Sequence, residues 1–390
     1  MPTSPQPGPG PCPAPPGEVV APTALPASTY THVVRAALPA SALARAPGRL
    51  ALIPTYLVVI AAATFAIATG LGGWPVAAAL VVVNGVAFAG LTFIGHELLH
   101  GSIAGGRRTR RVLGWITFLP FTMSPRLWEA WHNQIHHAHT NVDGQDPDQY
   151  PTLATYRANP SVRRFMDWFA LGGGRWRGLL SLAFGFTGQS VQILLSSRRR
   201  GFLPARAHRL ALAETALGVA LWTTLALVVG GGAFVLVFVL PLIIANTIVM
   251  AFILTNHGLS PLAERNDPLL ASLSVTGPRW VELLTLGFGY HVEHHVLPGV
   301  SSRHARAVRA VLQAHWPERY QALPHLQALV RLHRTARVYR DAITLIDPRT
   351  GATFPTLLPG VVTAPAPGPS VSASRTAPAT LPVVMPAPAR

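Results

Sequence analysis

Residues 131–146 read WHNQIHHAHTNVDGQD, and four of these sixteen residues are histidines. The chain also carries HELLH at residues 96–100 and HVEHH at residues 291–295, and each cluster lies beside a long apolar run. Imidazole is the commonest protein ligand for first-row transition metals. Histidine clusters at the ends of apolar runs therefore predict a metal enzyme embedded in a lipid bilayer.

The composition also indicates a membrane protein. Of the 390 residues, 49% are hydrophobic and only 12% are charged, which is too apolar for an ordinary soluble protein. All 31 basic residues are arginine, and the formal net charge is +16. Because the arginines gather between the apolar runs, we assign them to membrane topology and expect no nucleic-acid partner. The only cysteine, Cys12, excludes disulfides, thiolate metal sites and cysteine-bound iron–sulfur clusters within the chain.

Four apolar runs are long enough to cross a bilayer, which takes roughly 20 helical residues. They cover residues 50–71, 74–94, 210–229 and 233–255. Glycines separate the two runs of each pair, so the sequence predicts two helical hairpins. Shorter runs at 112–123 and 178–195 predict helices that lie at the interface or re-enter the bilayer. We expect an all-α integral membrane protein with four spans and a helical cap that carries the histidine clusters.

The distribution of arginine predicts the orientation in the membrane. Both hairpin turns lack arginine, whereas the flanks and the central stretch, residues 95–208, are rich in it. By the positive-inside rule, the histidine clusters and both termini face the cytoplasm, and we expect a bacterial inner membrane. Residues 1–28 and 346–390 are rich in proline, which predicts disordered tails around a membrane domain at residues 29–345.

The spacing of the histidines predicts which of them share a helix face. Three sets are three or four positions apart: His96 with His100, His132 with His136, and His291 with His294 and His295. On ideal α-helical geometry His137 turns about 100° away from His136, whereas His139 returns toward the first two. His257 stands alone at the end of the fourth run. Eight or nine histidines are too many for one ion, so the pattern indicates two metal ions with about four imidazoles each.

Each feature also has a simpler explanation. HELLH alone matches the HExxH motif of zinc proteases, with Glu97 as the general base. Isolated histidines are usually solvated or capping, as we expect for His139, His304, His315, His325 and His333. The neighbouring acids could orient ligand imidazoles or simply be solvated; these are Glu97, Glu293, Asp143, Asp146 and Asp148. None of these explanations accounts for three clusters on one membrane face.

The segments HELLHG, HNQIHHAHTN and GYHVEHHVLPGVSSRHA resemble the three histidine boxes of the membrane fatty acid desaturase and hydroxylase superfamily, over about residues 50–320. The resemblance implies a non-haem di-iron centre that activates O2 and removes hydrogen from an unactivated acyl chain. By position, it implies these iron ligands: His96, His100, His132, His136, His137, His291, His294 and His295. His257 would match the extra histidine that some members supply after the last span. Those members have an asparagine one helical turn earlier, where this chain has Ile253, with Asn256 adjacent to the histidine.

Details of the boxes favour the acyl-lipid branch. Three residues separate His96 from His100, as in acyl-lipid desaturases, and box three opens with His291 rather than the glutamine of front-end desaturases. The chain has no HPGG signature of a fused cytochrome b5, no GxGxxG fingerprint and no cysteine set for a ferredoxin. We therefore expect electrons from a separate ferredoxin- or cytochrome-type protein and its reductase. An arginine-rich face would suit an acidic donor.

Three classes of function remain open. The leading one is an O2-dependent acyl-lipid desaturase, and hydroxylation or ketolation of an acyl chain, alkane or carotenoid is poorly separated from it by the boxes. An intramembrane zinc protease needs a further acidic ligand that the last two spans lack. A metal transporter or sensor would need ionisable residues within the spans, where only Glu214 occurs. The candidate walls of an acyl tunnel are Trp128, Trp131, Phe252 and Trp280.

Overall fold

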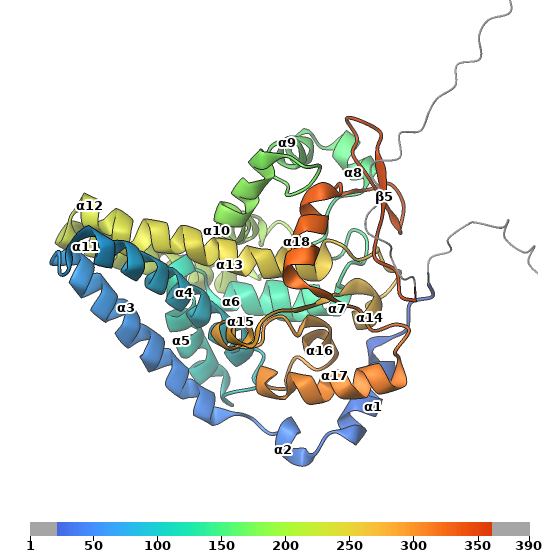
Figure 1. Cartoon of the computed structure of the whole chain (residues 1–390), viewed down its shortest axis with the longest axis horizontal. Helices are drawn as coiled ribbons and strands as arrows, with labels where there is room; N and C mark the ends of the chain where they lie inside the picture. The colour runs from blue at the N-terminus through green and yellow to red at the C-terminus, as the bar shows by residue number, and fades with distance from the viewer. Residues whose placement is uncertain (1–21, 361–390) are drawn as a thin grey trace, which may run out of the picture.

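The computed structural model describes residues 22–360 and is mostly helical, as predicted (Figure 1). Within that part, five helical segments rather than four are long and apolar enough to cross a membrane. They are Pro47–Ala68, Gly73–Leu99, Trp176–Ser196, Ala205–Val229 and Gly231–His257. The additional one, Trp176–Ser196, contains the run at 178–195, for which the sequence predicted a helix that lies at the interface or re-enters the bilayer.

Both predicted hairpins are present. The first joins α3 (Leu52–Ala68) to α4 (Gly73–Leu99), and its turn uses left-handed glycines that other residues adopt poorly. The second joins α11 (Ala205–Val229) through α12 (Gly231–Phe234) and a π-helical turn (Val235–Val239) to α13 (Leu240–His257). Ile67, Val81 and Val237 form one buried cluster near both turns. The two turns therefore lie at one end of the molecule, on the left in Figure 1, and the histidine clusters lie at the other end.

Helix α4 is the centre of the packing, because its second half is buried on every side. Two of its glycines explain how closely its neighbours approach. A Cβ on Gly85 would lie 2.6 Å from Ile244 of α13, and one on Gly90 would overlap the Tyr56 ring of α3. Small residues at helix crossings give van der Waals contact within a bilayer, where burial of apolar surface between helices supplies little driving force.

Helix α10 (Leu180–Ser196) follows a 3₁₀ turn (Trp176–Leu179) and packs against α13. Asn246 of α13 accepts hydrogen bonds from the backbone and side chain of Thr187 at 3.1 and 3.2 Å. The two helices are antiparallel, since Gly185 faces Met250 whereas Thr187 contacts Asn246. Just beyond the end of α10, Ser197 bonds His208 near the start of α11 at 2.9 Å.

The remaining elements form a compact cap around the histidine clusters. Its helices are α1 (Ala27–Ala37), α2 (Ala40–Leu43), α5 (Arg107–Thr117), α6 (Pro125–Trp128), α7 (His137–His139), α8 (Leu153–Ala158), α9 (Pro160–Trp168), α14 (Pro268–Ala271), α15 (Arg279–Leu284), α16 (His291–Val296), α17 (Ala305–His315) and α18 (His325–Arg334). A π-helix covers Glu129–His136, and short 3₁₀ turns cover Pro47–Ala51, Leu119–Phe121 and Ser302–His304. Strands β1 (Ser274–Thr276) and β2 (Ala322–Pro324) are parallel, and β3 (Val338–Tyr339), β4 (Thr344–Ile346) and β5 (Thr353–Pro355) form an antiparallel sheet.

A buried carboxylate, Asp267, fastens the N-terminal segment to the cap. Its oxygens accept hydrogen bonds from the Leu25 backbone at 2.7 Å and the Tyr30 hydroxyl at 3.0 Å, and Arg319 pairs with it at 2.6 Å. An uncompensated buried charge is costly, so the Asp267 carboxylate favours the one arrangement in which all three partners reach it. Helix α1 is thereby held against α17.

The predicted disordered tails, residues 1–28 and 346–390, lie largely outside the described residues. Their inner ends, residues 22–28 and 346–360, belong to the structure. Leu25 bonds Asp267, and Phe354 of β5 pairs with Leu345 of β4. The ordered domain therefore extends at both ends beyond the predicted limits of 29 and 345.

Candidate metal centre

All nine predicted ligands lie in two adjoining groups of imidazoles. The first histidine group comprises His96, His100, His132, His137 and His294, whose candidate ligand atoms lie within 4.8 Å of one another. Its Nε2 atoms converge: that of His132 is 3.1 Å from His96 and 3.2 Å from His137. The Nε2 atoms of His137 and His294 are 3.1 Å apart. Box one, box two and box three all contribute to this group.

The second histidine group comprises His136, His257, His291 and His295. Ligand atoms of His136, His257 and His295 also lie within 4.8 Å of one another. The Nε2 atom of His291 is 2.7 Å from that of His257 and 3.1 Å from that of His295. The two groups share a wall, since the His137 and His295 rings stack with centroids 4.2 Å apart. His257, the isolated histidine of the sequence, is thus a full member of this group.

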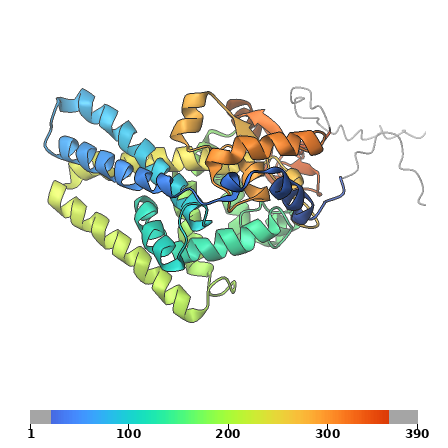
Figure 2. The ribbon, with the colours of Figure 1, turned by 90° about the horizontal axis from the view of Figure 1, so that it is seen from below.

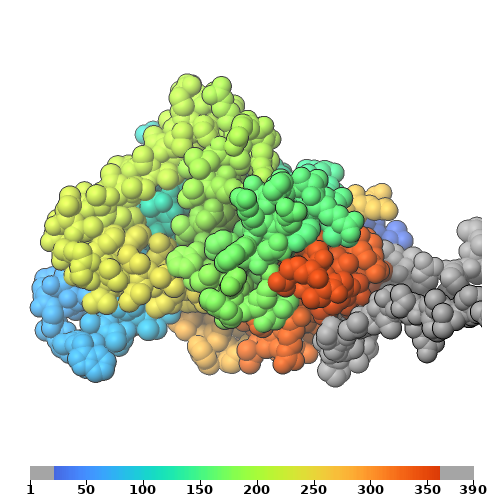
Figure 3. Space-filling model, turned by 90° about the horizontal axis from the view of Figure 1, so that it is seen from above, coloured from blue at the N-terminus to red at the C-terminus, as the bar shows by residue number. Residues whose placement is uncertain are grey.

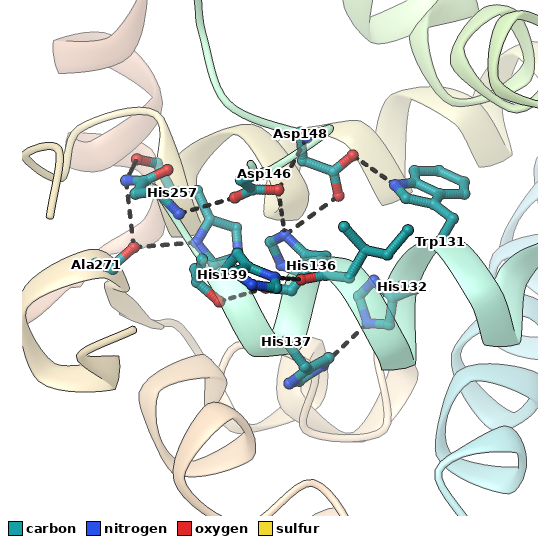
Figure 4. Close-up of polar contacts among 12 residues, drawn as sticks. Trp131, His132, His136, His137, His139, Asp146, Asp148, His257 and Ala271 are labelled. Carbon is teal, nitrogen blue, oxygen red and sulfur yellow. Dashed lines mark hydrogen bonds and ion pairs between the residues drawn. The ribbon is translucent and has the colours of Figure 1, made fainter. Parts of the chain in front are cut away.

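Box two departs from the α-helical geometry assumed in the sequence analysis. Residues Glu129–His136 form a π-helix, whose hydrogen bonds join residues five rather than four apart. His132 lies beside both His136 and His137, and His136 also belongs to the second group (Figure 4). The expectation that His132 and His136 share a face is confirmed, since their rings stack with centroids 5.1 Å apart and, with Asp148, their ligand atoms lie within 4.8 Å of one another. His139 bonds the Ile135 carbonyl at 3.1 Å and belongs to neither group.

Three of the four imidazoles of the second histidine group are oriented by hydrogen bonds at Nδ1. His136 Nδ1 donates to Asp146 at 2.9 Å, and His257 Nδ1 donates to the Ala271 carbonyl at 3.1 Å (Figure 4). Thr140 donates its hydroxyl proton to the His136 carbonyl and so accepts from His295 Nδ1 at 3.2 Å. Such partners fix the ring and leave the Nε2 lone pair free for a metal.

Two buried aspartates set the charge beside His136. Burial alone would lower the pKa of His136, but Asp146 and then Asp148 raise it to about 9. Burial acts to raise the pKa of Asp146, yet the charge of His136 holds it below its ordinary value. Burial raises the pKa of Asp148 to about 6. Asp148 accepts hydrogen bonds from Trp131 and Gln189, both at 2.7 Å. Sequence reasoning missed Gln189, and it named Trp131 only as a candidate wall residue and not as a partner of Asp148.

The other three acids named as possible orienting groups form hydrogen bonds and ion pairs with residues other than the nine histidines. Glu97 pairs with Arg49 at 2.9 Å and accepts hydrogen bonds from Ser301 and Ser302. Because these contacts occupy the carboxylate, the geometry gives no support to Glu97 as a protease general base. Glu293 is held by Arg309, Tyr320 and Ser274, and the exposed Asp143 by Gln149.

The histidines fit a bound metal because their Nε2 atoms cannot all form hydrogen bonds with one another. Each neutral Nε2 carries at most one proton, so the three contacts that link His96, His132, His137 and His294 include at most two hydrogen bonds. His100 Nε2 is buried with no hydrogen-bond partner among residues 22–360. Nitrogens about 2.1 Å from one ion and at right angles would be about 3.0 Å apart, close to the observed spacing.

The protonation of the rings agrees with this fit. Burial lowers the pKa of His294 to about 3, and it lowers the pKa of four further rings well below the ordinary value; these are His100, His132, His137 and His291. Burial does the same for His295. Neutral imidazoles offer the lone pair that a transition metal requires.

A mostly apolar cavity of about 40 Å³ touches both histidine groups. From the first group His96 and His132 line it, and from the second His136, His257 and His291 do so. Its other walls are Thr92, Phe93, Phe118, Trp128, Trp131, Asp148, Phe186, Gln189, Val249, Ile253 and Phe288. Trp128 and Trp131 were expected there. Phe252 instead packs behind Phe93 and Phe288, and Trp280 is 65% exposed, so these two assignments were wrong.

The isolated histidines outside the groups have ordinary partners where the contacts are known. Arg303 donates to His304, and His315 bonds the Val311 carbonyl on the surface. His325 differs from the expected surface position, since it is partly buried, bonds the Ala251 carbonyl and packs on Phe252.

Comparison with known proteins agrees with this arrangement. The family model described as "Fatty acid desaturase" matches residues 72–327, which include all nine histidines. The chain is 24% identical over 270 residues to an sn-1 oleoyl-lipid 12-desaturase of Synechocystis, covering 66% of this chain and 74% of that protein. It is 22% identical over 250 residues to a chloroplastic omega-6 fatty acid desaturase of Glycine max, covering 60% and 56%. An acyl-lipid 8-desaturase of Rebecca salina is 34% identical over 128 residues, which are 31% of this chain and 28% of that protein.

The chain spans about half the length of the plant relatives that it matches. The family model nevertheless covers well over half of this chain and contains every histidine of both groups. With five apolar helices of membrane-spanning length, the protein is a membrane protein. It belongs to the fatty acid desaturase family.

Proposed function

We propose that this protein is an O2-dependent acyl-lipid desaturase in which the two histidine groups hold a pair of iron ions. The observation that carries the proposal is the apolar cavity bordered by imidazoles of both groups. A methylene group has no polar handle, so only an apolar wall of fitting shape can bind it. The curated relatives named as acyl-lipid or oleoyl-lipid desaturases supply the substrate class.

Iron bound by these nine imidazoles would supply, with O2, the oxidant that removes hydrogen from the chain. The protein's own residues supply position. Trp128 stacks on His132 with ring centroids 4.4 Å apart, and Phe288 lies edge-on to His96 at 5.0 Å. The aromatic wall thus keeps water from the first histidine group and holds a methylene beside it. Asp146, Ala271 and Thr140 hold the rings of the second group.

The cavity as it stands admits only a few carbon atoms, since one water molecule takes about 30 Å³ of liquid. An acyl chain must therefore displace wall side chains when it enters. Phe186 of α10 and Ile253 of α13 line the cavity from two apolar helices that pack against each other. We place the entry between these two helices.

The membrane topology that we propose has four spans, with α10 at the interface. The start of α10 packs near Ala170 and Leu171 in the cap, and its end is tied to His208 near the start of α11. Both ends therefore lie on the histidine side, which suits a re-entrant or interfacial helix better than a crossing one. The arginine-free turns would then face outward and the histidine groups the cytoplasm of a bacterial inner membrane.

Electrons would come from a separate ferredoxin- or cytochrome-type protein and its reductase. Cys12 is the only thiol in these 390 residues, so the chain lacks the cysteines that an iron–sulfur cluster needs.

Fatty acid analysis tests the function. A bacterial host would express the chain with a compatible electron donor, and its methyl esters would be compared by mass spectrometry with those from a His136→Ala host. A loss of two mass units in one acyl chain, absent with His136→Ala, is the expected result. His139→Ala is the matched control, because His139 lies in the same segment but outside both groups; it should retain the product.

A gain of sixteen mass units instead would assign the hydroxylase reaction. No change in any fatty acid, with donor present and the protein in the membrane, would overturn the acyl-lipid assignment, and carotenoids and alkanes would be analysed next.

A further inference from the structure

A second polar site lies away from the histidine groups, where α5, α6 and α11 meet. It is an open hollow of about 540 Å³ lined by Arg107, Arg108, Arg111, Val112, Trp115, Arg126 and Glu214. In Figure 2, α5 lies between the α3–α4 hairpin and the yellow-green helix α11. Direct contacts hold this arrangement together, since Trp115 of α5 donates to the Glu214 carbonyl of α11 at 2.9 Å.

The hollow carries an excess of positive charge. Arg111 is paired with Glu129 at 2.8 Å and Arg126 with Glu214 at 2.7 Å. Arg107 and Arg108 are exposed and form no hydrogen bond or ion pair with any residue from 22 to 360. Two of the four guanidinium groups are therefore neutralised and two are not.

The position of Arg107 and Arg108 on α5 adds to the positive charge of the hollow. Arg107 and Arg108 are its first two residues, the first turn contains no acid, and no side chain caps its N–H groups. Positive side chains at the positive end of a helix repel its dipole, whereas an anion is stabilised there. The free arginines, the uncapped N–H groups and the hollow all favour a negatively charged occupant.

The apolar surroundings identify the kind of anion. Val112 and Trp115 form the inner wall, and tryptophan is typical of the boundary between head groups and hydrocarbon. Helix α11 leaves the hollow as an apolar segment with little cover: Leu217 is 52% and Leu221 is 45% exposed. In Figure 3, the yellow-green part of the chain that includes α11 projects from the rest of the molecule. An occupant with a phosphate and acyl chains would match both parts of this surface.

We propose that the hollow binds the phosphate of an anionic glycerophospholipid, with its acyl chains along the exposed face of α11. Arg107 and Arg108 contact the phosphate, and Trp115 lies at the level of the glycerol. Arg111 connects the hollow to the metal centre, since its partner Glu129 begins the π-helix that carries His132 and His136.

Native mass spectrometry of the purified full chain tests the proposal. The protein would be released from detergent with either phosphatidylglycerol or phosphatidylcholine, and retained lipid would be counted for each variant. The natural sequence should retain phosphatidylglycerol preferentially. Arg107→Gln together with Arg108→Gln should weaken that retention by roughly thirtyfold, since each arginine near anionic lipid contributes about one kcal/mol.

Arg198→Gln with Arg199→Gln is the matched control, because these arginines are also adjacent and exposed but lie outside the hollow. The control should change retention by less than about threefold. Equal losses in the two double variants would reveal general surface attraction and overturn the site. Complete displacement of the lipid by inorganic phosphate would also overturn it, because the acyl chains would then contribute nothing.

Discussion

The two histidine groups differ in the hydrogen-bond partners that orient their imidazole rings. Every Nδ1 that is hydrogen-bonded in the second group has a buried partner: Asp146 for His136, Ala271 for His257 and Thr140 for His295. In the first group, His137 Nδ1 and His100 Nε2 are buried with no partner among the described residues. In the second group three of the four imidazoles are thus held at Nδ1, and the buried Nδ1 of His291 has no partner among the described residues. The first group has five imidazoles that are less constrained.

This difference implies that the two metal positions of the proposed centre would bind iron unequally. Rings that are already oriented lose little freedom when a metal binds, and the carboxylate behind His136 strengthens it as a ligand. The first group offsets its looser support with a fifth ligand and faces the aromatic wall of the cavity. We expect the second group to hold its iron more tightly and the first to tolerate ligand loss better.

Removing one histidine from each group is the strongest way to separate them. His291→Ala leaves three imidazoles in the second group, and its iron content should fall from two to about one per chain. His294→Ala leaves four in the first group and should retain nearly two. Iron per protein by atomic emission gives the result. Both variants should lose more than about a hundredfold in desaturation, since losing a ligand costs more than losing an outer partner. Equal iron contents would contradict the inequality.

Asp146→Asn should weaken iron binding in the second group alone, by about ten- to a hundredfold, because the amide keeps the shape but removes the charge behind His136. Competition with a chromogenic chelator measures the two affinities. Asp143→Asn is the control, since this exposed carboxylate contacts only Gln149 in the described structure. An unchanged chelator titration for Asp146→Asn would show that the carboxylate does not tune the metal.

The two groups should also differ in pH dependence. The pKa of about 9 for His136 means that the metal-free second group holds an extra proton at neutral pH, which iron must displace. Its affinity should therefore fall about tenfold for each pH unit below 9. The first group should show no such slope between pH 7 and 9, since the pKa of His294 is about 3 and those of His100, His132 and His137 are also lowered by burial. Calorimetric iron titrations at several pH values would reveal parallel slopes if this distinction is incorrect.

Thr140→Val should produce the smallest effect. It removes the acceptor for His295 Nδ1 and should weaken iron binding in the second group by about fivefold, the equivalent of one hydrogen bond. Thr140 also donates to the carbonyl four residues earlier, as Thr223 does on α11. Thr223→Val is thus the control for that second bond. A similar loss of iron in both variants would place the effect in the helix rather than at His295.

The sequence was informative where a pattern repeats locally. The apolar runs predicted both hairpins, and the spacing of His96 and His100 predicted one shared group. It was uninformative where geometry depends on tertiary packing. The α-helical rule placed His137 away from His132, whose Nε2 it approaches to 3.2 Å, because a π-helix has no distinct residue pattern at this length. The partners of His136 were found as candidates only because aspartates follow box two within ten residues. Gln189 and Ala271, which come from distant elements, gave no local signal.

The Asp267 contact sets an order of events during synthesis. Tyr30 precedes its partner by 237 residues, and Arg319 follows later still. At about 5–20 residues per second, the ribosome needs about 12 to 47 s to deliver Asp267 after Tyr30. The first helix made is therefore among the last to be fastened, after both hairpins have been synthesised. A nascent chain arrested before residue 267 should leave α1 open to protease, and one extended past residue 319 should protect it.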